Sequence, residues 1–290
     1  MTVKNSALRR KETLTGLGFA LPSLLGFLSF FVIPFGIVIW YTFTQGIGGA
    51  KYAGLANYAD ILVNPAFLLA AQNTGRFFAV SVPLICVLSF LLALCLQKVG
   101  RRWLRTSFII PLIIPVATVT MFFQIAFADQ GPIIRFLEGM NISPQSFLHS
   151  SNAFWTLVIL YLWKNIGYTV ILFLAGLATI PREYYHMASL DGAGEWQQTV
   201  HITLPHIVPT AFFVIIIAII RSFSAFREAY LLAGEYPHRS IYMLQHFMNN
   251  NYRNLNYQRL SVAALLVFFV IFAFVLLMYF VKNKTEEHQA

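Results

Sequence analysis

The chain has 290 residues, of which 58% are hydrophobic and only 11% are charged. Soluble globular proteins have about 45 to 50% apolar and about 25% charged residues, so this composition excludes that class and indicates a single membrane domain. A net charge of +9 would suggest nucleic-acid binding in a soluble protein, but here the positions of the charges are more informative. Cys86 and Cys95 share one apolar run and predict neither a disulfide nor a metal site.

Six stretches of the chain are apolar enough and long enough to cross a membrane as helices, because about 20 apolar residues span the hydrocarbon core. In chain order they are residues 17–43, 77–97, 107–128, 153–179, 207–226 and 260–281. We therefore expect an all-α integral membrane protein with six transmembrane helices. Its expected parts are an N-terminal tail, 1–16, a six-span domain, 17–281, and a C-terminal tail, 282–290.

Basic residues set the expected direction of the spans, because lysine and arginine are retained on the cytoplasmic side. They precede the first span and fill the short turn between the second and third spans. These residues are Lys4, Arg9, Arg10, Lys11, Lys98, Arg101, Arg102 and Arg105. An even number of spans then places both termini in the cytoplasm. Four arginines in the last outer segment, 227–259, weaken this asymmetry.

The longest inner segment, 180–206, has the pattern of two short helices broken at a glycine. Residues 183–190 have helical composition, and Tyr184, Met187 and Ala188 share one face at spacings i, i+3 and i+4. Asp191 and Gly192 supply a stop and a sharp turn. A compact, partly apolar helix on the cytoplasmic side is suited to binding in a groove of a soluble partner.

The alternative for this segment is a helix that lies on the lipid surface. Glu183, Asp191 and Glu195 outnumber Arg182 there, which disfavours binding to anionic lipid. Docking to a partner is therefore the preferred interpretation.

The same segment resembles the signature of the membrane permeases of binding-protein-dependent ABC importers, which is Glu-Ala-Ala, three residues, Gly, nine residues, Ile-x-Leu-Pro. Gly192, Ile202, Leu204 and Pro205 match at this spacing. His186 and Met187 stand where Glu and Ala are usual, and only Ala188 of the triplet is kept. The resemblance implies a surface that contacts an ATPase. Its residues are Glu183, Tyr184, His186, Met187, Ala188, Asp191, Gly192, Ile202, Leu204 and Pro205.

The resemblance extends over about residues 15–281 and is to the carbohydrate-type permeases. Residues 54–58, Gly-Leu-Ala-Asn-Tyr, and 64–67, Asn-Pro-Ala-Phe, look like the stretch after their first span. The C-terminal tail lacks a glycine-rich basic end, so the chain is more similar to the first, maltose-type permease of the pair. This implies a bacterial or archaeal cytoplasmic membrane. The implied partners are a second permease, two ATPase subunits, an extracytoplasmic solute-binding protein and membrane lipid.

A polar stripe runs along the fourth span, where Tyr161, Lys164, Asn165 and Tyr168 are spaced i, i+3, i+4 and i+7. A cation at the centre of a membrane costs at least about 2.5 to 3.5 kcal/mol unless it is paired or reaches water. The stripe predicts a solute pathway, or alternatively a cluster of interhelical hydrogen bonds in which Lys164 snorkels or pairs with an acid on another subunit. Similarity to the maltose-type permease favours the pathway and adds Ser222 of the next span to it.

Arg221 lies toward the outer end of the fifth span, and neither that span nor the fourth supplies an acidic partner. Together, Lys164 and Arg221 could favour an anionic solute such as a uronate or glycerol phosphate. A neutral sugar or oligosaccharide is the main expectation, because many neutral-sugar relatives also have a lysine in the fourth span.

The last outer segment mixes arginines with tyrosines, a composition that can bind nucleic acid, but an exterior loop seldom meets nucleic acid. A solute-binding protein is therefore the expected partner of this segment, and ordinary solvation of its charges is the alternative.

No Gly-x4-Gly-Lys-Ser/Thr sequence occurs, so we expect ATP and Mg²⁺ to be bound by partner subunits and no cofactor in this chain. The rival classes are an intramembrane enzyme and an ion-coupled secondary transporter. The spans contain neither the acids nor the metal constellation that the enzyme would need, and the secondary transporter would be expected to show paired inverted halves or intramembrane carboxylates, neither of which is visible.

Overall fold

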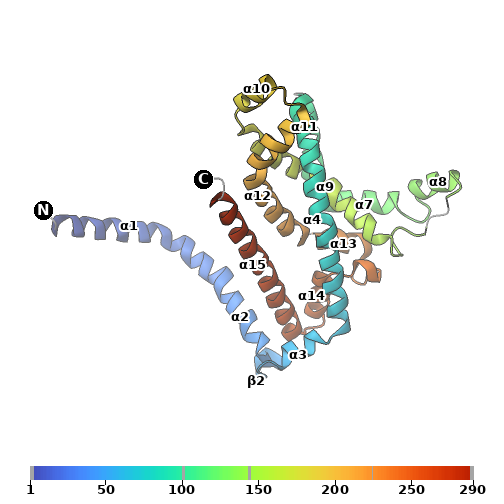
Figure 1. Ribbon diagram of the computed structural model, residues 1–290. Coiled ribbons are helices and arrows are strands. Elements are labelled where there is room, and N and C mark those ends of the chain that lie inside the picture. The colour runs from blue at the N-terminus through green and yellow to red at the C-terminus, as the bar shows by residue number, and fades with distance from the viewer. Residues whose placement is uncertain (1–2, 100–101, 143–144, 224, 288–290) are drawn as a thin grey trace. The chain divides into compact units, whose positions relative to one another are not determined.

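The computed structural model describes residues 3–99, 102–142, 145–223 and 225–287 (Figure 1). These residues form two compact units, which are described separately. The smaller unit comprises Met1–Asn64 with Asn251–Phe268, and the larger comprises Pro65–Asn250 with Phe269–Ala290.

Five helices in the described residues are long and apolar enough to cross a membrane, which agrees with the expected helical membrane fold. They are Thr15–Thr42, Pro65–Val99, Ala153–Ala178, Glu195–Ala233 and Tyr257–Val281, and Val116–Ala126 is a shorter apolar helix. The expected third span, 107–128, is therefore not one continuous helix. It consists of the end of α5 (Arg102–Ser107), then α6 (Ile110–Ile113) and α7 (Val116–Ala126).

Two prolines account for this break. Pro111 lies in the first turn of α6, and Ile114 adopts an extended backbone with ψ 131° directly before Pro115. A residue before proline avoids the helical region, and proline itself has no N–H to donate to the preceding turn. The chain therefore leaves the helix at Ile114 and starts again at Val116.

The smaller unit contains α1 (Val3–Phe27), the π-helix η1 (Leu28–Val32), α2 (Ile33–Thr42), β1 (Thr44–Gln45), η2 (Ile47–Gly49), β2 (Lys51–Tyr52), α3 (Ala56–Leu62) and the first part of α15 (Tyr257–Glu287). β1 and β2 pair antiparallel, with Thr44 opposite Tyr52. The Nδ2 of Asn57 donates to the carbonyl oxygens of Thr42 and Thr44 at 3.0 and 2.9 Å. Arg259 of α15 bonds Asp60 at 2.9 Å, so side chains join the short elements at this end of the unit.

The larger unit is built on α4 (Pro65–Val99), α9 (Ala153–Ala178) and α12 (Leu204–Phe223), which pack against one another (Figure 1). Phe77 of α4 and Tyr161 of α9 lie in its core with ring centroids 5.4 Å apart. The Tyr161 hydroxyl donates to the carbonyl oxygen of Ala218 in α12 at 3.1 Å. Burying large aromatic rings with their one polar atom bonded stabilises the three-helix contact.

Helix α4 begins twelve residues before the expected start of the second span at Phe77, so 65–76, expected as an outer segment, is helical. Pro65 is favoured in the first turn of a helix, since its missing N–H is not needed there. Asn73 in this extension donates to the carbonyl oxygens of Arg239 and Tyr242 at 2.5 and 2.9 Å. The extension thereby holds the segment that contains η4 (Arg239–Ile241).

Residues from the end of the expected fifth span, 207–226, onward form α13 (Ala225–Ala233), and the segments that were expected from the sequence to be outer also contain α8 (Pro132–Gly139) and α14 (Leu244–Arg253). Helix α13 packs against α7 and α9. The Nε2 of Gln124 in α7 donates to the carbonyl oxygens of Leu231 and Leu232 at 2.8 and 3.0 Å, which satisfies the last turn of α13. Residues expected in an outer loop, including Glu228, therefore lie on a helix beside the fourth span.

His246 of α14 is fully buried against the rings of Phe226, Tyr230 and Tyr242. Its Nδ1 accepts a hydrogen bond from the backbone N–H of Met243 at 3.2 Å, so the imidazole is neutral. Burial lowers the pKa of His246 from 6.5 to about 4, because the charged form loses its water.

We expect this histidine to make the protein less stable in acid. The unfolded chain takes up the proton near pH 6.5, whereas the folded chain takes it up only near pH 4. The free energy of unfolding therefore has its full value above pH 6.5 and falls by about 3 kcal/mol as the pH drops to about 4. Thermal unfolding of the detergent-purified protein between pH 7.5 and 4 measures this loss. His246→Phe should be less stable at pH 7.5 but should lose less between pH 6.5 and 4, whereas the exposed control His149→Gln should follow the unmodified protein. Equal pH dependence in all three proteins would contradict the assignment.

Candidate functional site

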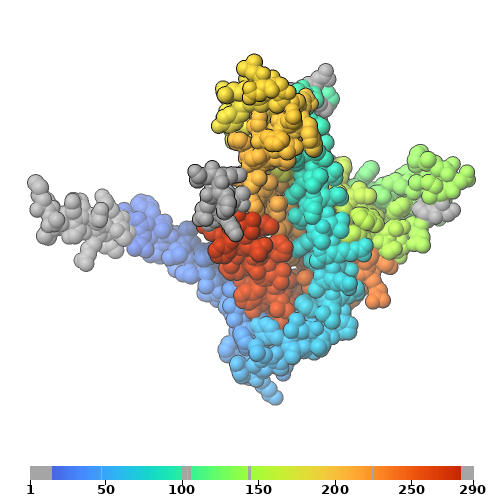
Figure 2. Space-filling view, viewed as in Figure 1, coloured from blue at the N-terminus to red at the C-terminus, as the bar shows by residue number. Residues whose placement is uncertain are grey.

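The inner segment that we expected to form two helices does so. It comprises α10 (Arg182–Leu190), α11 (Glu195–Gln198) and the π-helix η3 (Thr199–Thr203), and we call residues 182–203 the docking segment. Gly192 lies in the turn between α10 and α11 with φ +81°, a conformation that other residues rarely adopt. The docking segment lies where α9 ends and α12 begins, and Figure 2 shows it as a projecting lobe.

Polar contacts hold the two halves of the docking segment together. The hydroxyls of Tyr185 and Thr203 lie 2.9 Å apart, and Gln198 Nε2 donates to Ser189 Oγ at 2.9 Å and to the Ala193 carbonyl oxygen at 3.0 Å. Tyr185 and Ile202 also pack against the buried core formed by α4, α9 and α12. The segment is thus connected to the spans by side chains as well as by the backbone.

Large apolar side chains of the docking segment are exposed. Met187, Leu190 and Trp196 are 65%, 88% and 78% exposed. Of these, only Met187 was predicted to take part in docking. A hollow of about 320 Å³ separates the two helices. It is lined by Ala188, Asp191, Gly192, Ala193, Gln197, Gln198, His201 and Ile202.

Most of the remaining predicted docking residues lie on the exposed surface of the docking segment or in the first turn of α12, which follows it. Glu183, His186 and Asp191 are exposed, and the ring of Tyr184 lies 5.3 Å from that of His206. Leu204 and Pro205 are exposed in the first turn of α12. Ile202 is half-buried: it packs against the core and also lines the hollow between the two helices.

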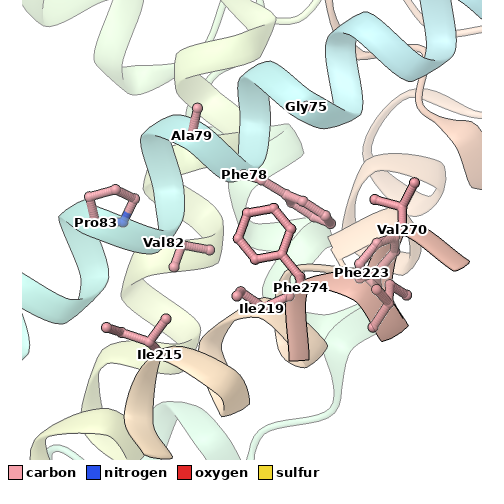
Figure 3. A pocket seen from close by; sticks show the side chains of 11 residues that line it. Gly75, Phe78, Ala79, Val82, Pro83, Ile215, Ile219, Phe223, Val270 and Phe274 are labelled. Atoms are coloured by element: carbon pink, nitrogen blue, oxygen red, sulfur yellow. The ribbon is translucent and has the colours of Figure 1, made fainter. Parts of the chain in front are cut away.

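An apolar hollow and a polar hollow lie among the described residues of the larger unit. The first, which we call the apolar groove, has a volume of about 360 Å³ (Figure 3). It is lined by Gly75, Phe78, Ala79, Val82, Pro83, Ile215, Ile219, Phe223, Val270, Ile271 and Phe274. None of these side chains can donate or accept a hydrogen bond, so the groove cannot orient a hydroxylated solute.

The second hollow, which we call the polar cavity, has a volume of about 470 Å³. It is lined by Leu112, Lys164, Asn165, Arg221, Arg227 and Glu228. Three of the six residues predicted for the solute pathway, Lys164, Asn165 and Arg221, are among them. Its volume lies within the range of about 300 to 1,000 Å³ that is usual for small-molecule sites.

Lys164 pairs with Glu228 of α13, and their Nζ and Oε1 atoms lie 2.5 Å apart. The two side chains are only 14% and 3% exposed. The sequence showed no acid in the fourth or fifth span and left pairing with an acid of another subunit as an alternative. The partner is instead Glu228 of this chain, which follows the fifth span and reaches the lysine because α13 packs against α9. The rule that an intramembrane cation needs an acid or water was the signal that could have found it.

Arg221 contacts only neutral groups among the described residues. Its Nη1 donates to Asn165 Oδ1 at 3.3 Å, and its guanidinium carbon lies 3.9 Å above the ring of Tyr168. Asn165 in turn donates through Nδ2 to the carbonyl oxygen of Tyr161 at 2.9 Å. The predicted stripe on α9 therefore acts as a support that fixes Arg221 at the cavity wall.

The other three predicted pathway residues, Tyr161, Tyr168 and Ser222, are not among the residues that line the polar cavity. Tyr161 is fully buried and its hydroxyl is bonded to Ala218. Ser222 is buried as well, and its Oγ donates to the carbonyl oxygen of Ile219 at 2.7 Å. In this structure both act in the packing of α9 and α12. From the sequence we assigned Arg227 to the last outer segment rather than to the solute pathway and did not single out Leu112, but both line the polar cavity.

Comparison with known proteins identifies the family. Residues 85–286 match the family described as the binding-protein-dependent transport system inner membrane component. The chain belongs to this family. The resemblance drawn from Gly192, Ile202, Leu204 and Pro205 is thereby confirmed.

Individual relatives of this inner membrane component are transport permeases. The probable ABC transporter permease protein YesP of Bacillus subtilis (strain 168) is 32% identical over 240 residues, which cover 80% of this chain and 77% of that protein. The arabinooligosaccharides transport system permease protein AraP of the same strain is 31% identical over 222 residues, covering 74% and 70%. A bacterial ABC transporter involved in the import of the acidic polysaccharide alginate shares the fold, with a TM-score of 0.84 at 21% identity over 96% of this chain and 98% of that chain.

Proposed function

We propose that the chain is the permease subunit of an ATP-driven importer that moves a sugar or oligosaccharide across the cytoplasmic membrane by alternating access. The observation that carries this proposal is that the docking segment connects α9 with α12. The same two helices contribute Lys164, Asn165 and Arg221 to the polar cavity. A force applied to the docking segment therefore acts directly on the helices that line the proposed solute pathway.

The names of the relatives support the solute class and the partners. AraP is a permease of an arabinooligosaccharide system, and a structure similar to this chain was solved in complex with an alginate-bound periplasmic protein. We infer that this chain works with a second permease, two ATPase subunits and an extracytoplasmic solute-binding protein. The exposed Trp155, Ile159 and Trp163 of α9 form an apolar stripe that suits membrane lipid or the second permease.

ATP and Mg²⁺ would be bound by the ATPase subunits, and this chain would perform no chemical reaction itself. Closure of the ATPase pair would pull on α10 and move α9 and α12 as rigid bodies. ATP can shift the permease between its inward-open and outward-open states only if the ATPase binds the docking segment with different affinity in the two states. The topology proposed for this arrangement has both termini and the docking segment in the cytoplasm.

We expect that changing Met187 to Asp will reduce co-purification of the ATPase with the permease by about 10-fold or more, and will reduce ATP-dependent uptake in parallel. Placing a charge on an exposed apolar anchor removes its burial at the interface and adds an unpaired charge there. Leu190→Asp should act in the same direction. The measurements are subunit composition of the purified complex and uptake of a labelled oligosaccharide into proteoliposomes that contain the complete importer.

The matched control is Met140→Asp, which alters another exposed methionine at the end of α8, outside the docking segment. It should leave ATPase co-purification unchanged. A proton uncoupler should not affect uptake when ATP is supplied. Uptake that stops with the uncoupler while ATP is present would instead favour a secondary transporter and would overturn the proposal.

A further inference from the structure

We infer that the polar cavity binds an anionic group of the transported solute through Arg221 and Arg227, and that Lys164 does not supply this charge. The inference rests on the proposed function and names the class of solute: a saccharide that bears a carboxylate or a phosphate ester. It differs from the sequence-based hypothesis, which assigned the attraction to Lys164 together with Arg221.

The charges around the cavity do not balance. Three of its lining residues are cations and one, Glu228, is an acid. The 2.5 Å contact between Lys164 and Glu228 neutralises those two charges against each other. Among the described residues, no acid pairs with Arg221 or Arg227. Two positive charges therefore remain among the residues that line the cavity.

Arg221 is held in place by groups that do not neutralise it. The amide oxygen of Asn165 accepts one of its hydrogen bonds, and the ring of Tyr168 supports one face of the guanidinium. A guanidinium has five N–H donors in a planar fork, so most of its donors are free for another partner. An arginine fixed by stacking loses little further freedom on binding, which favours bidentate contact with a carboxylate or phosphate.

Arg227 and the surroundings of the cavity strengthen the attraction. Arg227 is exposed on α13 and lines the same cavity, directly before the buried Glu228 in sequence. A cavity in a low-dielectric protein focuses the field of charges at its wall. A neutral sugar would leave both guanidinium groups without a charged partner, whereas an anionic solute would compensate them. The cavity should therefore discriminate by charge.

The test uses the complete importer in detergent, without its solute-binding protein, and measures affinity by the shift of the unfolding temperature with ligand concentration. The probes are trigalacturonate, its neutral counterpart galactotriose, and glucose 6-phosphate. Trigalacturonate or glucose 6-phosphate should bind at least about 10-fold more tightly than galactotriose, and which of the two binds distinguishes carboxylate from phosphate recognition. Galactotriose binding as tightly as both anions would overturn the inference.

The variants assign the charge to specific residues. Arg221→Gln and Arg227→Gln should each weaken binding of the anion by at least about 10-fold, and Arg221→Lys by less, because lysine keeps the charge but not the fork. Arg135→Gln removes an exposed cation of α8 outside the cavity and should have no effect. Co-purification of the ATPase verifies that each variant is folded.

The double variant Lys164→Met with Glu228→Gln separates the two assignments, since it removes the ion pair without changing the net charge of the cavity. Anion affinity should change by less than about 3-fold in this variant. A loss of anion binding there, with binding retained in Arg221→Gln, would overturn the inference. A last outcome concerns ATP-dependent uptake of a neutral saccharide. If this uptake is as fast in the arginine variants as in the unmodified importer, the anionic site is overturned and the proposed function stands.

Discussion

Replacing Lys164 by Met should destabilise the permease by about 3 to 5 kcal/mol, whereas replacing Lys164 and Glu228 together should recover most of that loss. Removing one partner of a buried ion pair leaves the other charge uncompensated, and this is far more costly than removing both. Glu228 is 3% exposed, and its second oxygen, Oε2, is buried without a hydrogen bond in the described residues. The carboxylate depends on Lys164 as its partner.

The two single variants should not be equivalent. Lys164 lines the polar cavity and has a long flexible side chain, so in Glu228→Gln its ammonium group can turn toward water. Glu228 also lines the cavity, but its side chain is shorter and only 3% exposed, so in Lys164→Met its charge reaches water much less readily. We therefore expect Lys164→Met to be the more damaging of the two changes.

The chain offers a matched control in a second ion pair. Lys98 and Glu195 lie 2.6 Å apart, but their side chains are 61% and 81% exposed. An exposed pair contributes only about 0 to 1 kcal/mol, so Lys98→Met should have little effect on stability. Thermal unfolding and the amount of protein in the membrane measure both series. A cost for Lys164→Met no larger than that for Lys98→Met, or a double variant worse than either single one, would show that the Lys164–Glu228 pair does not stabilise the fold.

Features governed by local sequence were predicted correctly. The helix over residues 183–190 follows from composition and from the spacing of Tyr184 and Met187, and the turn at Gly192 requires a positive φ that glycine adopts readily. The stripe on the fourth span was also correct as a pattern, since a helix of 3.6 residues per turn places Lys164, Asn165 and Tyr168 on one side. These features depend on neighbours within about ten residues.

Features governed by packing between distant elements could not be predicted in the same way. The partner of Lys164 lies 64 residues later in the sequence, and only the position of α13 beside α9 brings Glu228 to it. Tyr161 shares the stripe with Lys164, yet a hydrogen bond to Ala218 places it in the core rather than in the cavity. A one-dimensional pattern identifies the polar face of a helix but does not show which residues of that face line a cavity and which pack against a neighbouring helix.

Gly167 of α9 shows how a single small residue determines such a packing contact, and replacing it with Ala should be strongly damaging. A Cβ at this position would overlap the carbonyl oxygen of Phe108, which lies in the segment between α5 and α6. Backbone atoms cannot move aside as the end of a flexible side chain can, so the segment itself must shift. Overpacking of this kind costs about 1 to 3 kcal/mol, and a clash with backbone is expected at or above the upper end.

Gly75→Ala provides the matched control, because Gly75 also lies inside a long helix, α4, and a Cβ there would meet no atom within 4 Å. This change should be neutral or stabilising by about 0.5 to 1 kcal/mol, since alanine favours helix more than glycine does. Unfolding temperature and the amount of folded protein in the membrane distinguish the two variants. If Gly167→Ala and Gly75→Ala gave the same stability, the close approach of α9 to Phe108 would be wrong.

Gly167→Ala should also reduce transport by more than its effect on stability explains. The segment that would have to move away from Gly167 continues into α6, where Leu112 lines the polar cavity, and Gly167 itself is flanked by the helix positions that hold Arg221. Uptake per folded Gly167→Ala molecule should therefore fall by about 10-fold or more, because a displacement of about 1 Å in a binding site has effects of that order. Uptake that declines only in proportion to the amount of folded protein would mean that the contact at Gly167 supports the fold without shaping the cavity.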